Sequence, residues 1–408
     1  MSSEKPPPIR FIGLDIHKHY LIAVGVDEQL NPLFGPQRVQ LSNLEGWIKK
    51  TLNPQDAVVL EMTTNTWQVY DELLPHVHSV TVVHPPHVAL ITRSQVMTDK
   101  IAACHLARLH AKGLLVGIWI PPQEVRDLRS LIAQRAKMTR LSTQAKNRLH
   151  STLHRYHISL PPGDPFLPAR RAWWLSLPLT LPERTRLICD LDTLLFARQQ
   201  IAQLEACLNT LAAQEERLPL LAQLPGVSLI TALTLLAAIG DIARFPDAKH
   251  LVGYAGLGSR VHDSGQTTRT GRITKAGRKD LRAAMVEAAQ TAANTHPHWQ
   301  AELARLEPRL GRNKAIVAIA RKLLIAVWHV LTFQVADKHA EPVLVARKLM
   351  NLTYKMGIAN RPAGISSAAL VRAQLDRLRL AQDLTHIPWG AKKKPIPLPP
   401  SSPPTTLA

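Results

Sequence analysis

Phe11-Ile-Gly-Leu-Asp-Ile-His-Lys, followed one residue later by Tyr20-Leu-Ile-Ala-Val-Gly-Val, decides the fold of the first part of the chain. Both runs are short and apolar, which predicts two buried strands joined by a tight turn. Helix and strand patterns then alternate over Leu44–Leu52 (helix), Ala57–Glu61 (strand), Trp67–Leu74 (helix), Val80–Val83 (strand) and Lys100–Lys112 (helix). This order predicts an α/β domain over residues 9–120.

A long helical pattern follows over Val125–His157, with a strong excess of basic residues. A proline-rich break at Leu160–Pro168 separates it from a second long helix, whose apolar residues recur about every 3.5 positions, as in a coiled coil. We expect an antiparallel coiled-coil hairpin over residues 121–217, used as an arm; two helices inside a globular domain are the alternative. The basic residues expected to contact RNA are Arg126, Arg129, Arg135, Lys137, Arg140, Lys146 and Arg148.

The rest of the chain divides into three predicted parts. A compact, mainly helical domain is expected over residues 218–335, and a basic helical extension over residues 336–387. The last residues, 388–408, are rich in proline and include Lys392-Lys-Lys, which predicts a disordered tail.

Composition narrows the class of protein. The 408 residues include 50 lysines and arginines against 30 acidic residues, a net charge of +20, so polyanions are the expected partners. A basic protein without a nucleic-acid role is the alternative. The three cysteines form no CxxC pair, which argues against a zinc finger or a disulfide framework. The N-terminus is polar and no uncharged apolar run is long enough to span a membrane, so we expect a cytoplasmic protein without a membrane partner.

Acidic residues stand at the ends of predicted strands. Asp15 lies near the end of the first strand, Glu61 ends the strand Ala57–Glu61, and Asp99 follows near the start of a helix. Adjacent strand ends bring such carboxylates together, where they repel one another unless a divalent cation joins them. We therefore predict a Mg²⁺ (or Mn²⁺) site at Asp15, Glu61 and Asp99. Each acid alone could instead be a turn former, a helix cap or a surface charge.

Two glycine-containing stretches lie in the third predicted domain. Leu224-Pro-Gly-Val-Ser places a Pro-Gly turn directly before a helix, whose first backbone amides can hold a phosphate. Tyr254–Arg282 interleaves glycines and hydroxyls with basic residues, which suits close approach of the backbone to phosphates. Ser264 there could attack a phosphodiester; a flexible basic loop that only grips a nucleic-acid backbone is the alternative. The basic residues are Arg260, Arg269, Arg272, Lys275, Arg278, Lys279 and Arg282.

Two blocks resemble the insertion-sequence 110 family of transposases, also called DEDD transposases. Gly13-Leu-Asp-Ile-His-Lys, Glu61 and Thr98-Asp-Lys-Ile-Ala-Ala resemble its RuvC-like domain. The block from Leu224-Pro-Gly to Ile273-Thr-Lys-Ala-Gly, with Ser264-Gly inside it, resembles its C-terminal transposase domain. With the intervening helices, the resemblance covers roughly residues 9–335.

This resemblance implies a RuvC-like (RNase H-like) α/β domain, a coiled-coil hairpin and a mainly α-helical transposase domain. It implies a bacterial or archaeal, nucleoid-associated recombinase of a mobile element that works as a homo-oligomer, a dimer or a tetramer. A guide RNA would choose its target and donor DNA. Asp15, Glu61 and Asp99 would bind Mg²⁺, and Ser264, in preference to Ser259, would form a covalent phosphoserine link to DNA.

One position departs from the family pattern. The family's fourth acid lies three residues after the third, where this chain has Ala102. Either three carboxylates suffice, the substitution disables the chain, or another residue such as His105 helps. Two other functions therefore stay open: a RuvC-like metal-dependent endonuclease that uses water in place of Ser264, and a catalytically impaired relative that only binds RNA or DNA.

Overall fold

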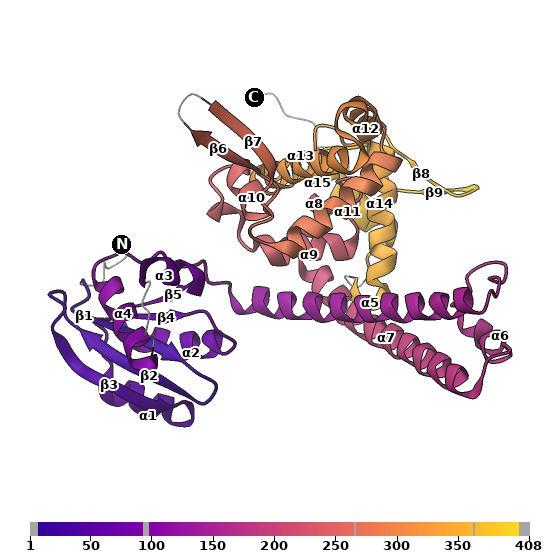
Figure 1. The fold of residues 1–408 in the computed structure, drawn as a ribbon. Coiled ribbons are helices and arrows are strands. Elements are labelled where there is room, and N and C mark those ends of the chain that lie inside the picture. Colours follow the sequence, from indigo (N-terminus) through magenta and orange to yellow (C-terminus); the bar gives the residue numbers. More distant parts are fainter. Residues whose placement is uncertain (1–6, 93–97, 265–266, 362–363, 400–408) are drawn as a thin grey trace, which may run out of the picture. The chain divides into compact units, whose positions relative to one another are not determined.

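The chain forms two compact units, residues 1–121 and 122–408, each with apolar cores of its own (Figure 1). The structure, a computed structural model, describes residues 7–92, 98–264, 267–361 and 364–399. The first unit is a mixed α/β domain and the second is mainly helical. This division confirms the predicted change from α/β to helical architecture along the chain.

A five-stranded sheet forms the centre of the first unit, in the order β3-β2-β1-β4-β5. β1 (Arg10–Ile16), β2 (Tyr20–Val26) and β3 (Pro32–Gln40) are antiparallel neighbours, while β4 (Asp56–Glu61) and β5 (Ser79–Val83) continue the sheet in parallel with β1. The four predicted strands are confirmed, and their ends agree to within two residues. β3 was missed because it is an edge strand with mostly exposed side chains, so its sequence lacks an apolar pattern.

Helices cover both faces of this sheet. α1 (Leu44–Thr51) and α2 (Thr66–Leu73) pack on the face that carries the buried Leu14 and Leu60. α4 (Asp99–Ala111) packs on the opposite face, where its Leu106 meets β4, β5 and α3 (Pro85–Thr92). The three predicted helices are thus confirmed, and the sheet is the middle layer of three.

A close backbone contact joins α4 to β1 at Gly13. A β-carbon on Gly13 would lie 2.2 Å from the carbonyl oxygen of Ala103 and 2.5 Å from the backbone nitrogen of Ala107, both in α4. No side chain fits in that space, so glycine is what lets the helix lie this near the strand. α4 begins at Asp99, so this contact also sets where Asp99 stands relative to β1.

Two long helices form a hairpin in the second unit. α5 (Gln123–Arg155) and α7 (Leu181–Gln214) pack along one another (Figure 1). Their connection contains α6 (Arg171–Leu175), whose Trp174 is buried with leucines of both long helices in a separate small core. At the other end, Ile132 and Leu208 join the large core of the unit. The hairpin is therefore anchored at both ends.

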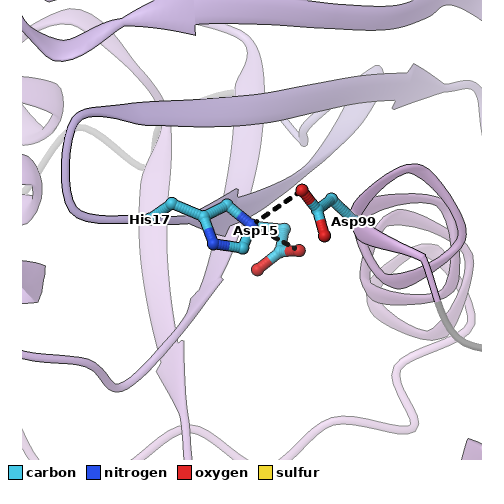
Figure 2. A group of neighbouring side chains, drawn as sticks. All are labelled: Asp15, His17 and Asp99. Atoms are coloured by element: carbon cyan, nitrogen blue, oxygen red, sulfur yellow. Dashed lines mark ion pairs between the residues drawn. The ribbon is translucent and has the colours of Figure 1, made fainter.

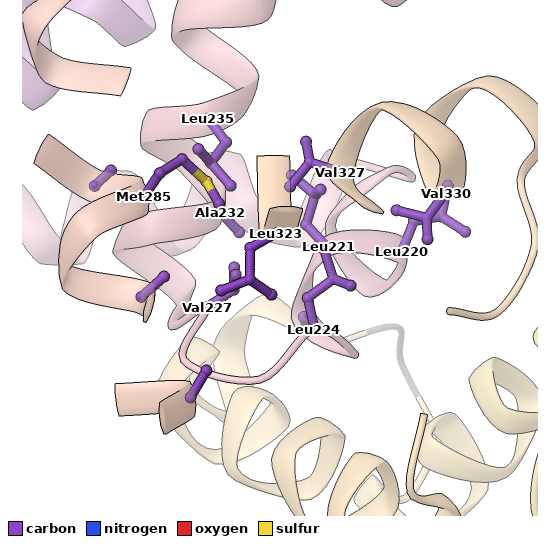
Figure 3. Packing of buried hydrophobic residues seen from close by; sticks show 14 of the residues in the cluster. Leu220, Leu221, Leu224, Val227, Ala232, Leu235, Met285, Leu323, Val327 and Val330 are labelled. Atoms are coloured by element: carbon purple, nitrogen blue, oxygen red, sulfur yellow. The ribbon is translucent and has the colours of Figure 1, made fainter. Parts of the chain in front are cut away.

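The remaining helices pack around that large core, part of which Figure 3 shows. They are α8 (Leu218–Ala222), α9 (Leu229–Ile239), α10 (Ala248–Tyr254), α11 (Lys279–Thr295), α12 (Pro297–Leu310), α13 (Arg312–Phe333), α14 (Pro342–Met356) and α15 (Ser367–Arg377). Among the described residues, α13 alone has the length and composition of a membrane span. Its Leu323, Leu324 and Val327 are fully buried in the core, as expected of a core helix.

Two β-hairpins occur where none was predicted. β6 (Ser259–Ser264) pairs with β7 (Thr267–Ile273) in the glycine-rich stretch, for which no strands were predicted. β8 (His386–Trp389) pairs with β9 (Lys392–Pro395), so the prediction of disorder from residue 388 is wrong for this segment. The second hairpin is ordered because Ile387, within β8, and Ile396, directly after β9, are buried in the helical core. Residues 400–408 of the predicted tail lie outside the described residues.

Replacing Gly13 with alanine tests the contact between β1 and α4. We expect Gly13→Ala to destabilise the first unit by about 2–3 kcal/mol, because the added methyl group forces helix and strand apart. Hydrogen-exchange mass spectrometry of peptides from β1 and α4 measures this locally. Gly35→Ala, in β3 with no atom near the added β-carbon, is the control and should change stability by less than about 0.5 kcal/mol. Equal effects of the two substitutions would contradict the packing argument.

Candidate functional site

Asp15, His17 and Asp99 meet at the end of β1 (Figure 2). The Nε2 atom of His17 lies 3.3 Å from a carboxylate oxygen of Asp15 and 3.2 Å from one of Asp99. One potential ligand atom from each residue lies within 4.8 Å of the other two. All three side chains are partly exposed, so an ion from solvent can reach them.

Local structure explains why these side chains converge. Side chains alternate along a strand, so Leu14 enters the core shared with α1 and α2 while Asp15 lies on the face covered by α4. Asp99 is the first residue of α4, after Thr98, whose side chain accepts a hydrogen bond from the N–H of Ile101 at 3.4 Å. The hydroxyl of Tyr20 donates a 3.0 Å hydrogen bond to Asp99. The strand, the helix cap and β2 together orient the two aspartates.

Glu61 stands at the neighbouring strand end. β1 and β4 are parallel with Leu14 paired to Leu60, so Asp15 and Glu61 follow at the same level on adjacent strands. Glu61 lies outside the group of Asp15, His17 and Asp99 defined by the 4.8 Å spacing. The negative charge of Asp15 nevertheless acts on Glu61 and raises the pKa of the Glu61 carboxyl group. The prediction that three acids from distant positions lie near one another agrees with this geometry, and Glu61 is the more peripheral of them.

Burial and neighbouring negative charge oppose ionisation of Asp15 and Glu61. Burial raises the pKa of Asp15; His17 lowers it in part, and the charge of Asp99 raises it again. Burial, followed by the charge of Asp15, raises the pKa of Glu61. A divalent cation removes this repulsion. The residues fit one, because carboxylate oxygens are ligands that suit Mg²⁺ and Mn²⁺.

His17 was not predicted as a site residue although it stands in the first quoted motif. Its spacing of two from Asp15 was the available signal, because strand residues two apart point to the same face. The proposed helper His105 does not belong to the described group. Ala102, at the expected fourth acid, is helical and partly exposed, with its N–H bonded to the carbonyl oxygen of Thr98 at 2.8 Å. Position 102 therefore has the helical backbone expected at the fourth acid, but its side chain is a methyl group and not a carboxylate.

Comparison with known proteins identifies the family. Residues 218–304 match the model described as Transposase IS116/IS110/IS902 family, and residues 12–158 match the DEDD transposase model of IS110. The "Pilin gene-inverting protein" of Moraxella bovis is 30% identical over 79% of this chain and 95% of its own length. The "Transposase for insertion sequence element IS1111A" of Coxiella burnetii is 25% identical over 80% of this chain and 90% of its own length. The chain belongs to the IS110 family of transposases.

Family membership bears directly on the acidic group. The transposase is the enzyme of an insertion element, and DEDD transposases depend on divalent metal ions. Asp15, Glu61 and Asp99 lie in the segment that matches the DEDD model, and Ser264 lies in the segment that matches the second model. The two predicted centres therefore belong to different units of the transposase.

The β6-β7 hairpin contains the predicted nucleophile. Ser264 pairs with Thr267, the last described pair between β6 and β7. The side chains of residues 261–270, including those of Ser264 and Arg269, lie outside the described residues. Ser259, the less favoured candidate, begins β6 at the opposite end of the hairpin. The backbone position of Ser264 thus differs clearly from that of Ser259.

Glycines fix the base of this hairpin. A β-carbon on Gly256 would lie 2.1 Å from the carbonyl oxygen of Ala276, and one on Gly277 would lie 2.3 Å from that of Tyr254. In the transposase these glycines serve backbone packing, whereas the sequence suggested phosphate contact. Among the predicted phosphate-binding residues, Arg278 pairs with Asp280 at 2.9 Å. Side chains exposed to solvent are those of Arg260, Arg272, Lys275 and Lys279.

The basic residues of α5 are less available than their number suggests. Arg135 donates to Glu205 at 2.8 Å and Arg148 to Asp190 at 2.5 Å, both acids of α7. Arg155 of α5 pairs with Glu183, also in α7, at 2.7 Å. The charge excess seen within α5 is thus partly balanced across the hairpin, which the sequence of α5 alone could not show.

Of four further basic residues of α5, two have contacts within the protein and two are exposed to solvent. Arg129 donates to the carbonyl oxygens of Ala237 and Ala238, at 2.7 and 3.1 Å, at the end of α9. Lys146 lies 5.4 Å from the ring centre of Phe166. Lys137 and Arg140 are exposed, and no ion pair is recorded for either among the residues that the structure describes. These two are the basic residues of α5 best placed to meet a polyanion.

Asparagine in place of Asp15 tests the metal centre. We expect Asp15→Asn to weaken Mn²⁺ binding more than about 10-fold in isothermal titration calorimetry, because a ligand is lost. Ala102→Asp should tighten binding, because it adds a carboxylate one helical turn after Asp99. Asp71→Asn, on α2 across the sheet, is the charge-matched control and should leave binding unchanged.

Stability of the metal-free protein checks that the loss is specific. A carboxyl group with a raised pKa favours the folded state below its unfolded pKa, and this stability is lost as pH rises through its folded pKa. At pH 7 Asp15→Asn should therefore not destabilise the metal-free unit. Lost Mn²⁺ binding together with a clearly less stable fold would point to a structural role for Asp15.

Proposed function

We propose that this transposase breaks and rejoins DNA strands through a phosphoserine intermediate on Ser264, assisted by Mg²⁺ or Mn²⁺ at Asp15, Glu61 and Asp99. The convergence of Asp15 and Asp99 at the end of the central strand carries this proposal. The sheet order, with acids on β1, β4 and the following helix, supports a RuvC-like fold. A bound cation would neutralise charge that develops on phosphate oxygens.

The proposed reaction is a pair of transesterifications. The Oγ atom of Ser264 attacks a phosphorus atom of DNA, forming a P–O bond while the bond to a deoxyribose oxygen breaks; the serine proton leaves and the deoxyribose oxygen gains one. A hydroxyl of another strand then attacks the phosphoserine, which joins the strands and restores the serine. Each step exchanges one phosphoester for another, so no nucleotide cofactor is needed. The printed name of the Moraxella relative, a gene-inverting protein, supports rearrangement of DNA over simple cutting.

An RNA guide and a multimeric assembly complete the proposal. The net charge of +20 favours binding of nucleic acid, RNA as well as DNA. Lys137 and Arg140 on α5 are the proposed contacts of the arm with RNA. The enzyme would act as a dimer or a tetramer, because exchange between donor and target DNA needs several strand breaks.

Alanine in place of Ser264 tests the nucleophile. We expect Ser264→Ala to abolish the covalent protein–DNA adduct that wild-type protein forms on labelled donor DNA with Mn²⁺, detected by denaturing gel electrophoresis. Ser259→Ala is the control and should retain the adduct. Undiminished adduct formation by Ser264→Ala would refute the assignment, and strand cleavage that never yields an adduct would favour the metal-dependent endonuclease.

Ala102 favours one alternative function, a relative that binds nucleic acid without catalysis. That reading requires the wild-type chain to be inactive, and Ala102→Asp to create strand cleavage under the same conditions. An active wild-type chain would exclude it.

Charge reversal on α5 tests the RNA contact. Lys137→Glu with Arg140→Glu should weaken RNA binding and lower the slope of log affinity against log salt by about 1–2, roughly 0.7 for each lost phosphate contact. Fluorescence anisotropy with labelled RNA from beside the gene measures both. Glu124→Lys, at the exposed start of α5, is a control that adds charge elsewhere on the helix. Unchanged affinity of the double variant would refute a role of this face in RNA binding.

A further inference from the structure

The turn before α9 and the helix α14 enclose a cavity of about 460 Å³. Its floor is the Pro225–Leu229 turn, which is anchored to the large core by Leu224 and Val227 (Figure 3). α11 and α14 supply the walls. α14 lies beyond the residues that either family model matches, so the cavity combines a family motif with a segment of no assigned role.

Residues at the start of α9 line this cavity. Ser228 caps the helix by accepting the N–H of Thr231 at 3.2 Å. The N–H of Leu229 belongs to the first helical turn, where helix geometry provides no acceptor four residues earlier. Leu229 and Ser228 both line the cavity. The start of α9, where the helix dipole is positive, therefore borders the cavity, which favours an anion there.

Three basic residues of α14 meet the same space: Arg347, Lys348 and Lys355. The only acid among the lining residues is Glu341. The ammonium group of Lys348 donates a hydrogen bond to the carbonyl oxygen of Leu224, and burial lowers the pKa of Lys348 to about 7. Arg347 and Lys355 are exposed. The lining thus carries three basic side chains against one acidic side chain, an excess of positive charge.

His296 provides a second, independent sign of a ligand. It lies between α11 and α12, is 3% exposed and lines the cavity. Among the described residues, neither of its ring nitrogens has a hydrogen-bond partner of good geometry, although the backbone of His339 approaches the ring. A buried polar group left unpaired destabilises the fold, and a hydrogen bond to a ligand oxygen would remove that cost.

We propose that this cavity binds a backbone phosphate of the nucleic acid on which the transposase acts, held by the start of α9, Arg347, Lys348, Lys355 and His296. The proposal rests on the proposed function in one respect, that the chain binds nucleic acid. The cavity exceeds the size of one phosphate group, which leaves room for the adjoining sugar. The segment after the family-matched region thereby acquires a role in substrate binding.

Two exposed residues allow a test with little risk to the fold. Full-length Arg347→Gln/Lys355→Gln is compared with Arg309→Gln/Arg321→Gln, a control with the same charge change on exposed positions of α12 and α13. Binding of a labelled 20-base-pair DNA and of a labelled 20-nucleotide RNA is titrated at several salt concentrations. We expect the cavity variant to bind one of them about 10-fold more weakly than the control, with a salt slope smaller by about 1–2.

The outcome on the two probes identifies the source of the phosphate. Weaker binding of the DNA probe or of the RNA probe by the cavity variant supports the phosphate site and identifies which nucleic acid occupies it. If the cavity variant binds both probes as tightly as the control variant does, the phosphate site is overturned. If wild-type protein bound neither probe, the proposed function would fail, and inorganic phosphate would still test the cavity. At matched ionic strength phosphate should then raise the melting temperature of wild-type protein more than that of Arg347→Gln/Lys355→Gln, and equal shifts would overturn the site.

Discussion

Close packing of α4 on β1 at Gly13 is the constraint on which the acidic group depends. With the carbonyl oxygen of Ala103 2.2 Å from where a β-carbon would stand, helix and strand are as near as backbones allow. The helix begins at Asp99, so this contact places that carboxylate beside the end of β1 and within 3.2 Å of His17. A residue with no side chain thus determines where a charged residue stands, and any larger residue at position 13 would move a ligand of the proposed metal site.

The group that results is electrostatically unfavourable on its own. Burial and mutual repulsion raise the pKa values of Asp15 and Glu61, and His17 offsets the cost only in part by standing between Asp15 and Asp99. Such conflicts are typical of functional sites, where local stability is given up for ligand binding. The hydrogen bond from Tyr20 and the cap at Thr98 keep Asp99 in place despite the repulsion. The surrounding fold therefore holds ready a site that a cation would complete.

Much of this fold could be predicted from periodicity, because β1, β2, β4 and β5 are buried and their apolar runs are continuous. β3 could not be predicted, because most side chains of this edge strand are exposed and its sequence has no apolar pattern. The β8-β9 hairpin could not be predicted either, because its order depends on two isoleucines that pack into a core of helices distant in the sequence. Asp15, Glu61 and Asp99 were predictable from their positions at element ends. His17 had a usable signal in its spacing of two from Asp15, whereas the pairing of Arg135 and Arg148 with α7 required the register of two helices.

The central claim is that Asp15, Asp99 and Glu61 hold a divalent cation although Ala102 replaces the fourth acid. Anomalous diffraction from crystals of the full-length chain soaked in Mn²⁺ tests it most directly. If these acids bind the cation, a manganese peak lies at the end of β1, about 2.0–2.4 Å from carboxylate oxygens of Asp15 and of at least one of the other two acids. Crystals soaked in millimolar Mn²⁺ that show no manganese peak at these carboxylates, whether or not Mn²⁺ binds elsewhere, would contradict cation binding by these three acids.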